Sequence, residues 1–143
     1  MRDPSWVDAI LEWRWTWFLA RLGLTSAYLL GGIVKLANFS AAIAEQEHFG
    51  FHPGWAWAAA AIAVELIGSL LVLTGRLVWF GAGALGVLTA LATFAASPFW
   101  TMEGQARFMA TNTFFEHLGL IAGFVLVAML AERDERRPRD SAC

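Results

Sequence analysis

Residues 55–74 read WAWAAAAIAVELIGSLLVLT, and after Gly75 and Arg76 residues 77–97 read LVWFGAGALGVLTALATFAAS. An α-helix rises about 1.5 Å per residue, so each run is long enough to cross the ~30 Å hydrocarbon core of a bilayer. Two further runs of this kind lie at residues 15–38 and 113–131. The strands of a membrane barrel would alternate in polarity, and these runs do not. The sequence therefore predicts an all-α integral membrane protein, a four-helix bundle with four spans.

The composition is typical of a membrane protein. Of the 143 residues 58% are hydrophobic and 15% are charged, whereas soluble domains carry about 25% charged residues. Residues 39–131 hold seven Asp, Glu, Lys or Arg side chains, too few for the outer face of a bundle in water. With a single cysteine, Cys143, and a formal net charge of −2, a disulfide scaffold and a nucleic-acid partner are excluded. We expect a single membrane domain over residues 1–143, with the lipid bilayer as its partner.

Arginines orient the four spans across the membrane. With four spans, both termini and the turn at Gly75 and Arg76 share one side, and the connections 39–54 and 98–112 share the other. The first side carries seven arginines and the second carries Arg107 alone, so the positive-inside rule places both termini in the cytoplasm. Tryptophans gather at the ends of the spans, as an aromatic belt does. The seven arginines are Arg2, Arg14, Arg76, Arg133, Arg136, Arg137 and Arg139.

One face of the first span is polar. At about 100° per residue, five of its side chains fall within about 40° of one line. A polar face at this depth is costly against lipid, so we expect it to face the interior of the bundle. The five residues are Arg21, Thr25, Tyr28, Gly32 and Lys35.

The depths of the charged residues predict two ion pairs. Glu65 lies about 15 Å from either end of the second span, at the midplane of the bilayer. Arg21 is within about 6 Å of it in height, and Lys35 and Glu116 lie at nearly equal depth near the outer surface. We therefore expect the pairs Arg21–Glu65 and Lys35–Glu116. Three interpretations stay open. The pairs only fix the register of the helices, or the groups bind a polar headgroup or relay a proton, or Glu65 is hydrated and neutral.

Small residues predict close packing in the third and fourth spans. Such residues at steps of three and four let helix backbones approach closely. The fourth span contains Gly119-x-x-x-Gly123, and the stripe in the third span consists of Ala82, Gly86, Thr89, Thr93 and Ser97.

The histidines do not predict a metal or haem site. His48 and His52 lie in the first outer connection, and no second cysteine or aspartate completes a ligand set with them. His117 is the only histidine in a span, so a haem held by two histidines is not expected. We expect no metal and no redox cofactor of the chain's own. Glu116 and His117, at the outer end of the fourth span, are candidate binding residues.

Motifs along most of the chain follow a recognisable order. RLGL begins at Arg21, GGIVKL occupies residues 31–36, ELIGSLLVLTGR occupies residues 65–76, and Asn112 precedes EHLGLIAG. From about Arg21 to Leu130 the chain resembles the DoxX family of small four-span bacterial membrane proteins. The resemblance implies a helical bundle in the bacterial cytoplasmic membrane. A frequent C-terminal ending of the family, a Gly-rich turn leading to Arg, Ser and Asp, is replaced here by ERDERRP at residues 132–138. The family's polar positions are matched by Arg21, Lys35, Glu65 and Asn112.

The resemblance also implies a function. Members similar to this chain are described as membrane components of quinone- or quinol-linked oxidoreductase systems. We expect the polar interior to meet a small lipophilic molecule such as a quinone ring, with Tyr28, Lys35 and Glu65 hydrogen-bonding or protonating its oxygens. Because no redox centre is recognisable, electrons would come from a partner enzyme, and enzymatic activity of the chain itself stays open. The alternatives are a non-enzymatic scaffold or assembly subunit, and a small-molecule transporter.

Overall fold

The predicted all-α membrane architecture is confirmed. The computed structural model describes residues 4–140, and of residues 135–140 the backbone alone. Helices account for 89% of the described residues, and four of them are long and apolar enough to span a membrane. Arg2 and Cys143, and the side chains of Arg136, Arg137 and Arg139, lie outside what is described. The four spans are Arg14–Ala37, Gly54–Thr74, Val78–Thr101 and Gly104–Asp134.

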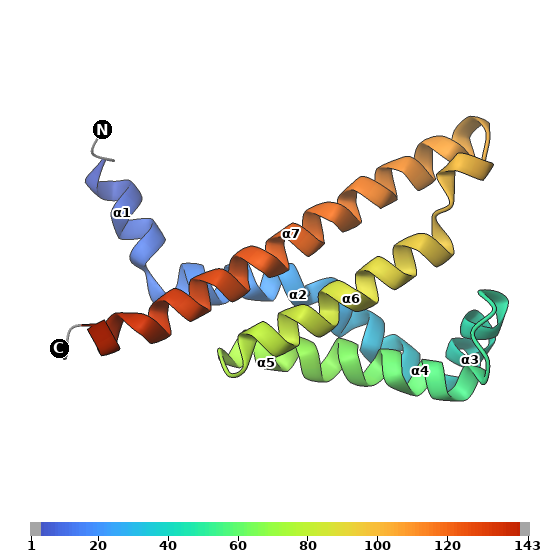
Figure 1. Cartoon of the computed structure of the whole chain (residues 1–143), viewed down its shortest axis with the longest axis horizontal. Helices are drawn as coiled ribbons and strands as arrows, with labels where there is room; N and C mark the ends of the chain where they lie inside the picture. The colour runs from blue at the N-terminus through green and yellow to red at the C-terminus, as the bar shows by residue number, and fades with distance from the viewer. Residues whose placement is uncertain (1–3, 141–143) are drawn as a thin grey trace.

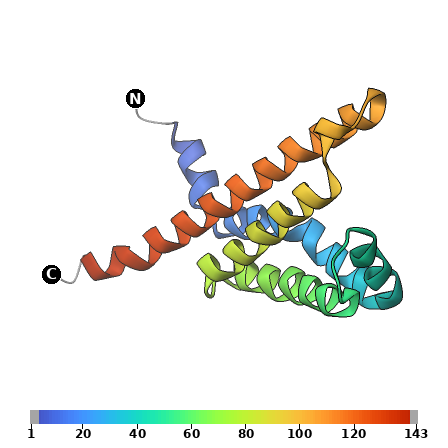
Figure 2. The ribbon, with the colours of Figure 1, turned by 45° about the vertical axis from the view of Figure 1, so that its right-hand side comes forward.

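A short helix precedes the first span. α1 (Ser5–Glu12) is described in full and contains no buried residue. Trp13 is extended, with φ −68° and ψ 124°, and separates α1 from α2 (Arg14–Ala37). α1 therefore leaves the bundle at a steep angle to α2 (Figure 2).

A further helix covers the far end of α2. α3 (Phe39–His48) begins after Asn38, whose side-chain oxygen accepts a hydrogen bond from the N–H of Ala41 at 3.3 Å. The next span begins with α4 (Gly54–Ala63). A Cβ on Gly54 would lie 2.6 Å from Cγ of Glu47, so glycine lets this carboxylate approach the N-terminus of α4. Negative charge is favourable there because the helix dipole is positive at that end.

The second span is one helix with a π-helical middle. α4 continues into the π-helical segment η1 (Val64–Gly68) and then into α5 (Ser69–Thr74). Segments of this kind are rare and occur frequently at functional sites. Glu65 is the second residue of η1 and is buried. The rare backbone geometry thus coincides with the one acidic residue of this span.

The last two spans form a hairpin. A turn with positive φ at Gly75 (73°) and Leu77 (48°) leads into α6 (Val78–Ala96), and the short 3₁₀ segment η2 (Phe99–Thr101) precedes α7 (Gly104–Asp140). α7 begins well before residue 113, the predicted start of the fourth span. α7 packs chiefly along α6. Both hairpin helices diverge from α4 and α5 toward the end of the molecule where α3 lies (Figures 1 and 2).

Two helices cross η1 at glycines. A Cβ on Gly32 of α2 would lie 2.8 Å from Cδ2 of Leu66, and a Cβ on Gly81 of α6 would lie 2.7 Å from the carbonyl oxygen of Gly68. Close approach therefore depends on Gly32 and Gly81. At Gly86 and Gly119, where the small-residue patterns predicted it, an added Cβ would meet no described atom within 4 Å. The other four residues of the α6 stripe are buried, and a Cβ on Gly123 would lie 3.1 Å from Cδ1 of Leu24. The periodicity therefore identified the packed face of α6 for the most part, but not the glycine at which α6 crosses η1.

The apolar core lies between α2, α5, α6 and α7. Val72, Ala82, Leu85 and Phe124 are buried together, and the ring of Tyr28 packs edge-on against Phe124 with centroids 5.4 Å apart. Most large apolar side chains on the outer surface of the four spans are exposed, as a lipid-facing surface requires.

Gly81→Ala tests the crossing at η1. The added methyl would press on backbone rather than on a flexible side chain, so we expect the free energy of unfolding to fall by about 1–3 kcal/mol. Gly86→Ala on the same helix is the control. Alanine has a better helix propensity than glycine, so we expect this variant to be more stable by up to about 1 kcal/mol. Unfolding in detergent micelles, followed by circular dichroism, measures both. Equal stability of the two variants would contradict the close crossing.

Candidate functional site

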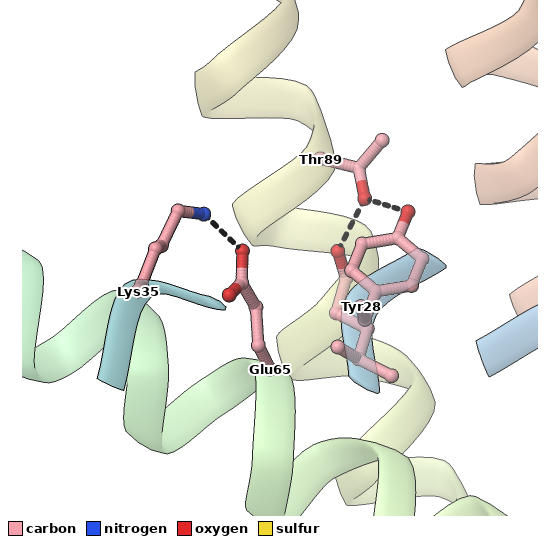
Figure 3. Close-up of polar contacts among 5 residues, drawn as sticks. Tyr28, Lys35, Glu65 and Thr89 are labelled. Atoms are coloured by element: carbon pink, nitrogen blue, oxygen red, sulfur yellow. Dashed lines mark hydrogen bonds and ion pairs between the residues drawn. The ribbon is translucent and has the colours of Figure 1, made fainter. Parts of the chain in front are cut away.

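A buried ion pair joins α2 to η1. Nζ of Lys35 donates a hydrogen bond to Oε1 of Glu65 at 2.6 Å (Figure 3). Glu65 is only 7% exposed, whereas the side chain of Lys35 keeps 23% of its surface accessible. The pair therefore combines a buried carboxylate with an ammonium group that has hydrogen-bonding capacity to spare.

The predicted pairs Arg21–Glu65 and Lys35–Glu116 are wrong. Side chains on a helix tilt toward its N-terminus. Lys35 therefore reaches back toward the middle of α2, where Glu65 lies. Arg21 reaches away from Glu65, and its guanidinium lies 5.9 Å from the Trp17 ring centroid. Glu116 is exposed on α7, which packs on α6 rather than beside the end of α2.

Arg21 instead lies beside the end of the second span. Its Nη1 is 3.1 Å from where a Cβ on Gly75 would be, at the C-terminal turn of α5. Positive charge is favourable at a helix C-terminus. Its Nε has no hydrogen-bond partner among the described residues.

Two glycines of α2 face Glu65, and of these Gly32 is the one where an added Cβ would be too close. A Cβ on Gly31 would lie 3.5 Å from Oε2 and 3.7 Å from Oε1, and a Cβ on Gly32 would lie 3.2 Å from Cβ of Glu65. Oε2 is buried and has no hydrogen-bond partner within residues 4–140. A buried acceptor without a partner is costly and uncommon. Within the described residues, one oxygen of this buried carboxylate is therefore left unused by the ion pair.

A cavity of about 640 Å³ borders the pair and lies between α3, α4 and α6. Lys35 and Glu65 lie in its wall together with Glu45 and Gln46 from α3, and the rest of the lining is largely apolar. Sites for small molecules are typically about 300–1,000 Å³, with a few polar groups in an apolar wall. The arrangement is therefore that of a binding site for a small, mostly apolar molecule.

A second polar network links α2, α6 and α7. The hydroxyl of Thr89 donates to the carbonyl of Leu85 at 2.7 Å, so it accepts the hydrogen of the Tyr28 hydroxyl, 2.5 Å away (Figure 3). Thr93 likewise donates to the carbonyl of Thr89, and its hydroxyl lies 2.7 Å from Nδ1 of His117. Nδ1 of His117 therefore carries a hydrogen and donates it to Thr93. Neither Tyr28 nor His117 is among the described residues that line the cavity.

The other sequence candidates lie apart from the cavity. Asn112 and Glu116 are exposed on α7, one helical turn apart. The sequence marks seven residues as candidates for binding, and the structure brings two of them, Lys35 and Glu65, into one site. The other five are Arg21, Tyr28, Asn112, Glu116 and His117. Glu45 and Gln46 were missed, since a pattern of spans treats residues 39–54 as an outer loop. α3 brings these two side chains to the cavity.

Comparisons with known proteins give one family. Residues 16–98, more than half of the chain, match the sequence profile of the DoxX family. The match covers α3 and the spans that contribute Lys35, Glu65 and the α6 wall of the cavity. No curated protein and no solved structure was found to match the chain.

A double-mutant cycle tests the ion pair. Lys35→Met leaves the buried carboxylate without its partner, so we expect the free energy of unfolding to fall by about 3–5 kcal/mol. Lys35→Met combined with Glu65→Gln removes both charges, and we expect a coupling energy of about 1–3 kcal/mol between the two changes.

The superseded pairings provide the control cycles. Lys35→Met with Glu116→Gln, and Arg21→Gln with Glu65→Gln, should be additive within about 0.5 kcal/mol. Additive losses for Lys35 and Glu65, or coupling in a control cycle, would refute the pairing. Unfolding in mild detergent provides all the free energies.

Proposed function

The chain belongs to the DoxX family and is a multi-pass membrane protein, and on this basis we propose that it is the membrane component of a quinone- or quinol-linked oxidoreductase system. In this proposal the cavity beside Lys35 and Glu65 binds the quinone ring. The observation that carries the proposal is the Lys35–Glu65 pair in the wall of a largely apolar cavity.

The chemistry of the pair suits both forms of such a ring. Lys35 has three N–H donors, one of which is directed to Glu65, so donors remain for the carbonyl oxygens of a quinone. Glu65 also lines the cavity, and its carboxylate is an acceptor group suited to a quinol hydroxyl. Glu65 also fixes the position of the Lys35 ammonium group. A bound quinone would supply the capacity to take up electrons and protons.

The electrons come from a partner in this proposal. The sequence contains no recognisable redox motif, and Lys35 and Glu65 are groups that hold a ring or carry a proton. The partner is therefore a redox enzyme that docks at the membrane. A non-enzymatic scaffold is the second candidate, because the same ion pair fixes the register of α2 against η1 without any ligand.

We place the protein in the bacterial cytoplasmic membrane with both termini in the cytoplasm. α1, the C-terminal end of α7 and the turn between α5 and α6 lie toward one end of the molecule (Figure 1). Arg14, Arg76 and Arg133 belong to that end, and Arg107 belongs to the opposite one. The positive-inside rule supports this orientation.

Co-purification tests the proposed ligand. We expect native mass spectrometry of the protein in mild detergent to detect a bound quinone. Lys35→Met removes a hydrogen-bond donor to the ring worth about 1–2 kcal/mol, and Glu65→Gln removes the charge that holds the Lys35 ammonium group in place. Each variant should therefore reduce quinone occupancy by about tenfold. Glu116→Gln, which changes an exposed carboxylate outside the cavity, should leave it unchanged. Absence of quinone from the wild type, even after quinone is added, would favour the scaffold.

Thiol labelling tests the orientation. In a Cys143→Ser background, Gln105→Cys places a thiol at the start of α7 and Ser5→Cys places one at the start of α1. A maleimide that does not cross membranes should label Gln105→Cys in intact cells and Ser5→Cys only after the membrane is opened. The reverse pattern would overturn the proposed orientation.

A further inference from the structure

We infer, on the basis of the proposed quinone site, that the cavity takes a quinone or quinol with a long apolar tail, its ring at the α3 end and its tail along α6 toward Trp79. The direction of the ligand in the membrane follows from how polar and apolar side chains are distributed along the cavity wall.

The polar part of the wall lies toward one end. Lys35 is near the C-terminal end of α2, and Glu45 and Gln46 belong to α3, which follows it directly. α3 lies beside the start of α4, at the end of the molecule where α6 has diverged (Figure 1). Glu65 is the deepest polar residue of this wall. A compact polar head therefore fits between α3 and η1.

The apolar part of the wall is much longer than a ring. The residues that α6 contributes extend from Trp79 to Ala96, a helix length of about 25 Å. This length approaches the ~30 Å hydrocarbon core of a bilayer. A ring beside Lys35 and Glu65 occupies only the part of the cavity nearest α3. The remaining wall along α6 is suited to a hydrocarbon chain, because it contains no charged residue and its polar side-chain atoms are limited to the indole N–H of Trp79 at its far end.

This apolar part of the wall contains Gly83, which is exposed and leaves open space beside α6 within the cavity lining. A Cβ on Gly83 would meet no described atom within 4 Å, and Ala84 beside it is also small. Val87 and Leu91 follow one and two turns along the same face of α6 and are exposed. A chain lying on Gly83 therefore contacts apolar side chains along its length. The ligand enters sideways from the lipid, because this face is not covered by another described helix.

Photolabelling with two probes tests the direction. The first probe is a decyl-benzoquinone with an azide on its ring, and the second is the same molecule with a diazirine at the end of its tail. In the wild-type protein we expect the ring probe to label peptides of α3 and α4. The tail probe should label the first half of α6, around Trp79 and Phe80.

Two matched leucine variants locate the tail. Gly83→Leu places a side chain in the part of the cavity where we expect the tail. Labelling by the tail probe should therefore fall by about tenfold, while labelling by the ring probe persists. Gly86→Leu places the same side chain in open space on α6 outside the cavity lining and should change neither. Persistent ring labelling also shows that Gly83→Leu folds.

The outcomes separate the two proposals. Ring labelling at α3 and α4, with tail labelling spread over the outer faces of α2 and α7 or unaffected by Gly83→Leu, overturns the direction of the tail and leaves the quinone site standing. If the ring probe labels no part of the cavity, the proposed function fails and the inference fails with it.

Discussion

The structure depends on the burial of one carboxylate near the middle of a bilayer. A charge at that depth is costly unless an opposite charge or hydrogen-bonding groups meet it inside the protein. Lys35 supplies that charge, and the 2.6 Å contact requires α2 to cross the second span next to Glu65. Gly32 allows this crossing, because a Cβ there would lie 2.8 Å from Cδ2 of Leu66. The ion pair therefore sets where the first two spans meet.

The cavity follows from the same crossing. α6 packs closely on the other side of the second span, where Gly81 meets Gly68, and diverges from α4 farther along. The Tyr28–Thr89 and Thr93–His117 contacts attach α2 and α7 to the opposite face of α6. One face of α6 is thus used for packing, and the other lines the space beside the Lys35–Glu65 pair. Tight packing at the glycines and an open wedge beyond them belong to one arrangement of helices.

The sequence predicts the fold well and the site in part. The four spans follow from hydropathy. The interior positions of Lys35 and Glu65 follow from the cost of placing a charge in lipid. The partners did not follow, because a count of depth along ideal helices ignores the tilt of side chains toward the helix N-terminus. That tilt brings Lys35 toward Glu65 and takes Arg21 away from it. The cavity was not predicted because it depends on crossing geometry, and Gly81 and Gly86 are indistinguishable in a pattern of small residues.

The most direct test is a distance measured in a lipid bilayer. Solid-state NMR on protein carrying ¹⁵N-lysine and ¹³C-glutamate can measure the dipolar coupling between Nζ of Lys35 and Cδ of Glu65, since Lys35 is the only lysine in the chain. The account predicts strong coupling, as a direct hydrogen bond produces, and its loss in Glu65→Gln. No coupling to Lys35, or coupling that persists in Glu65→Gln and so arises from another glutamate, would contradict it.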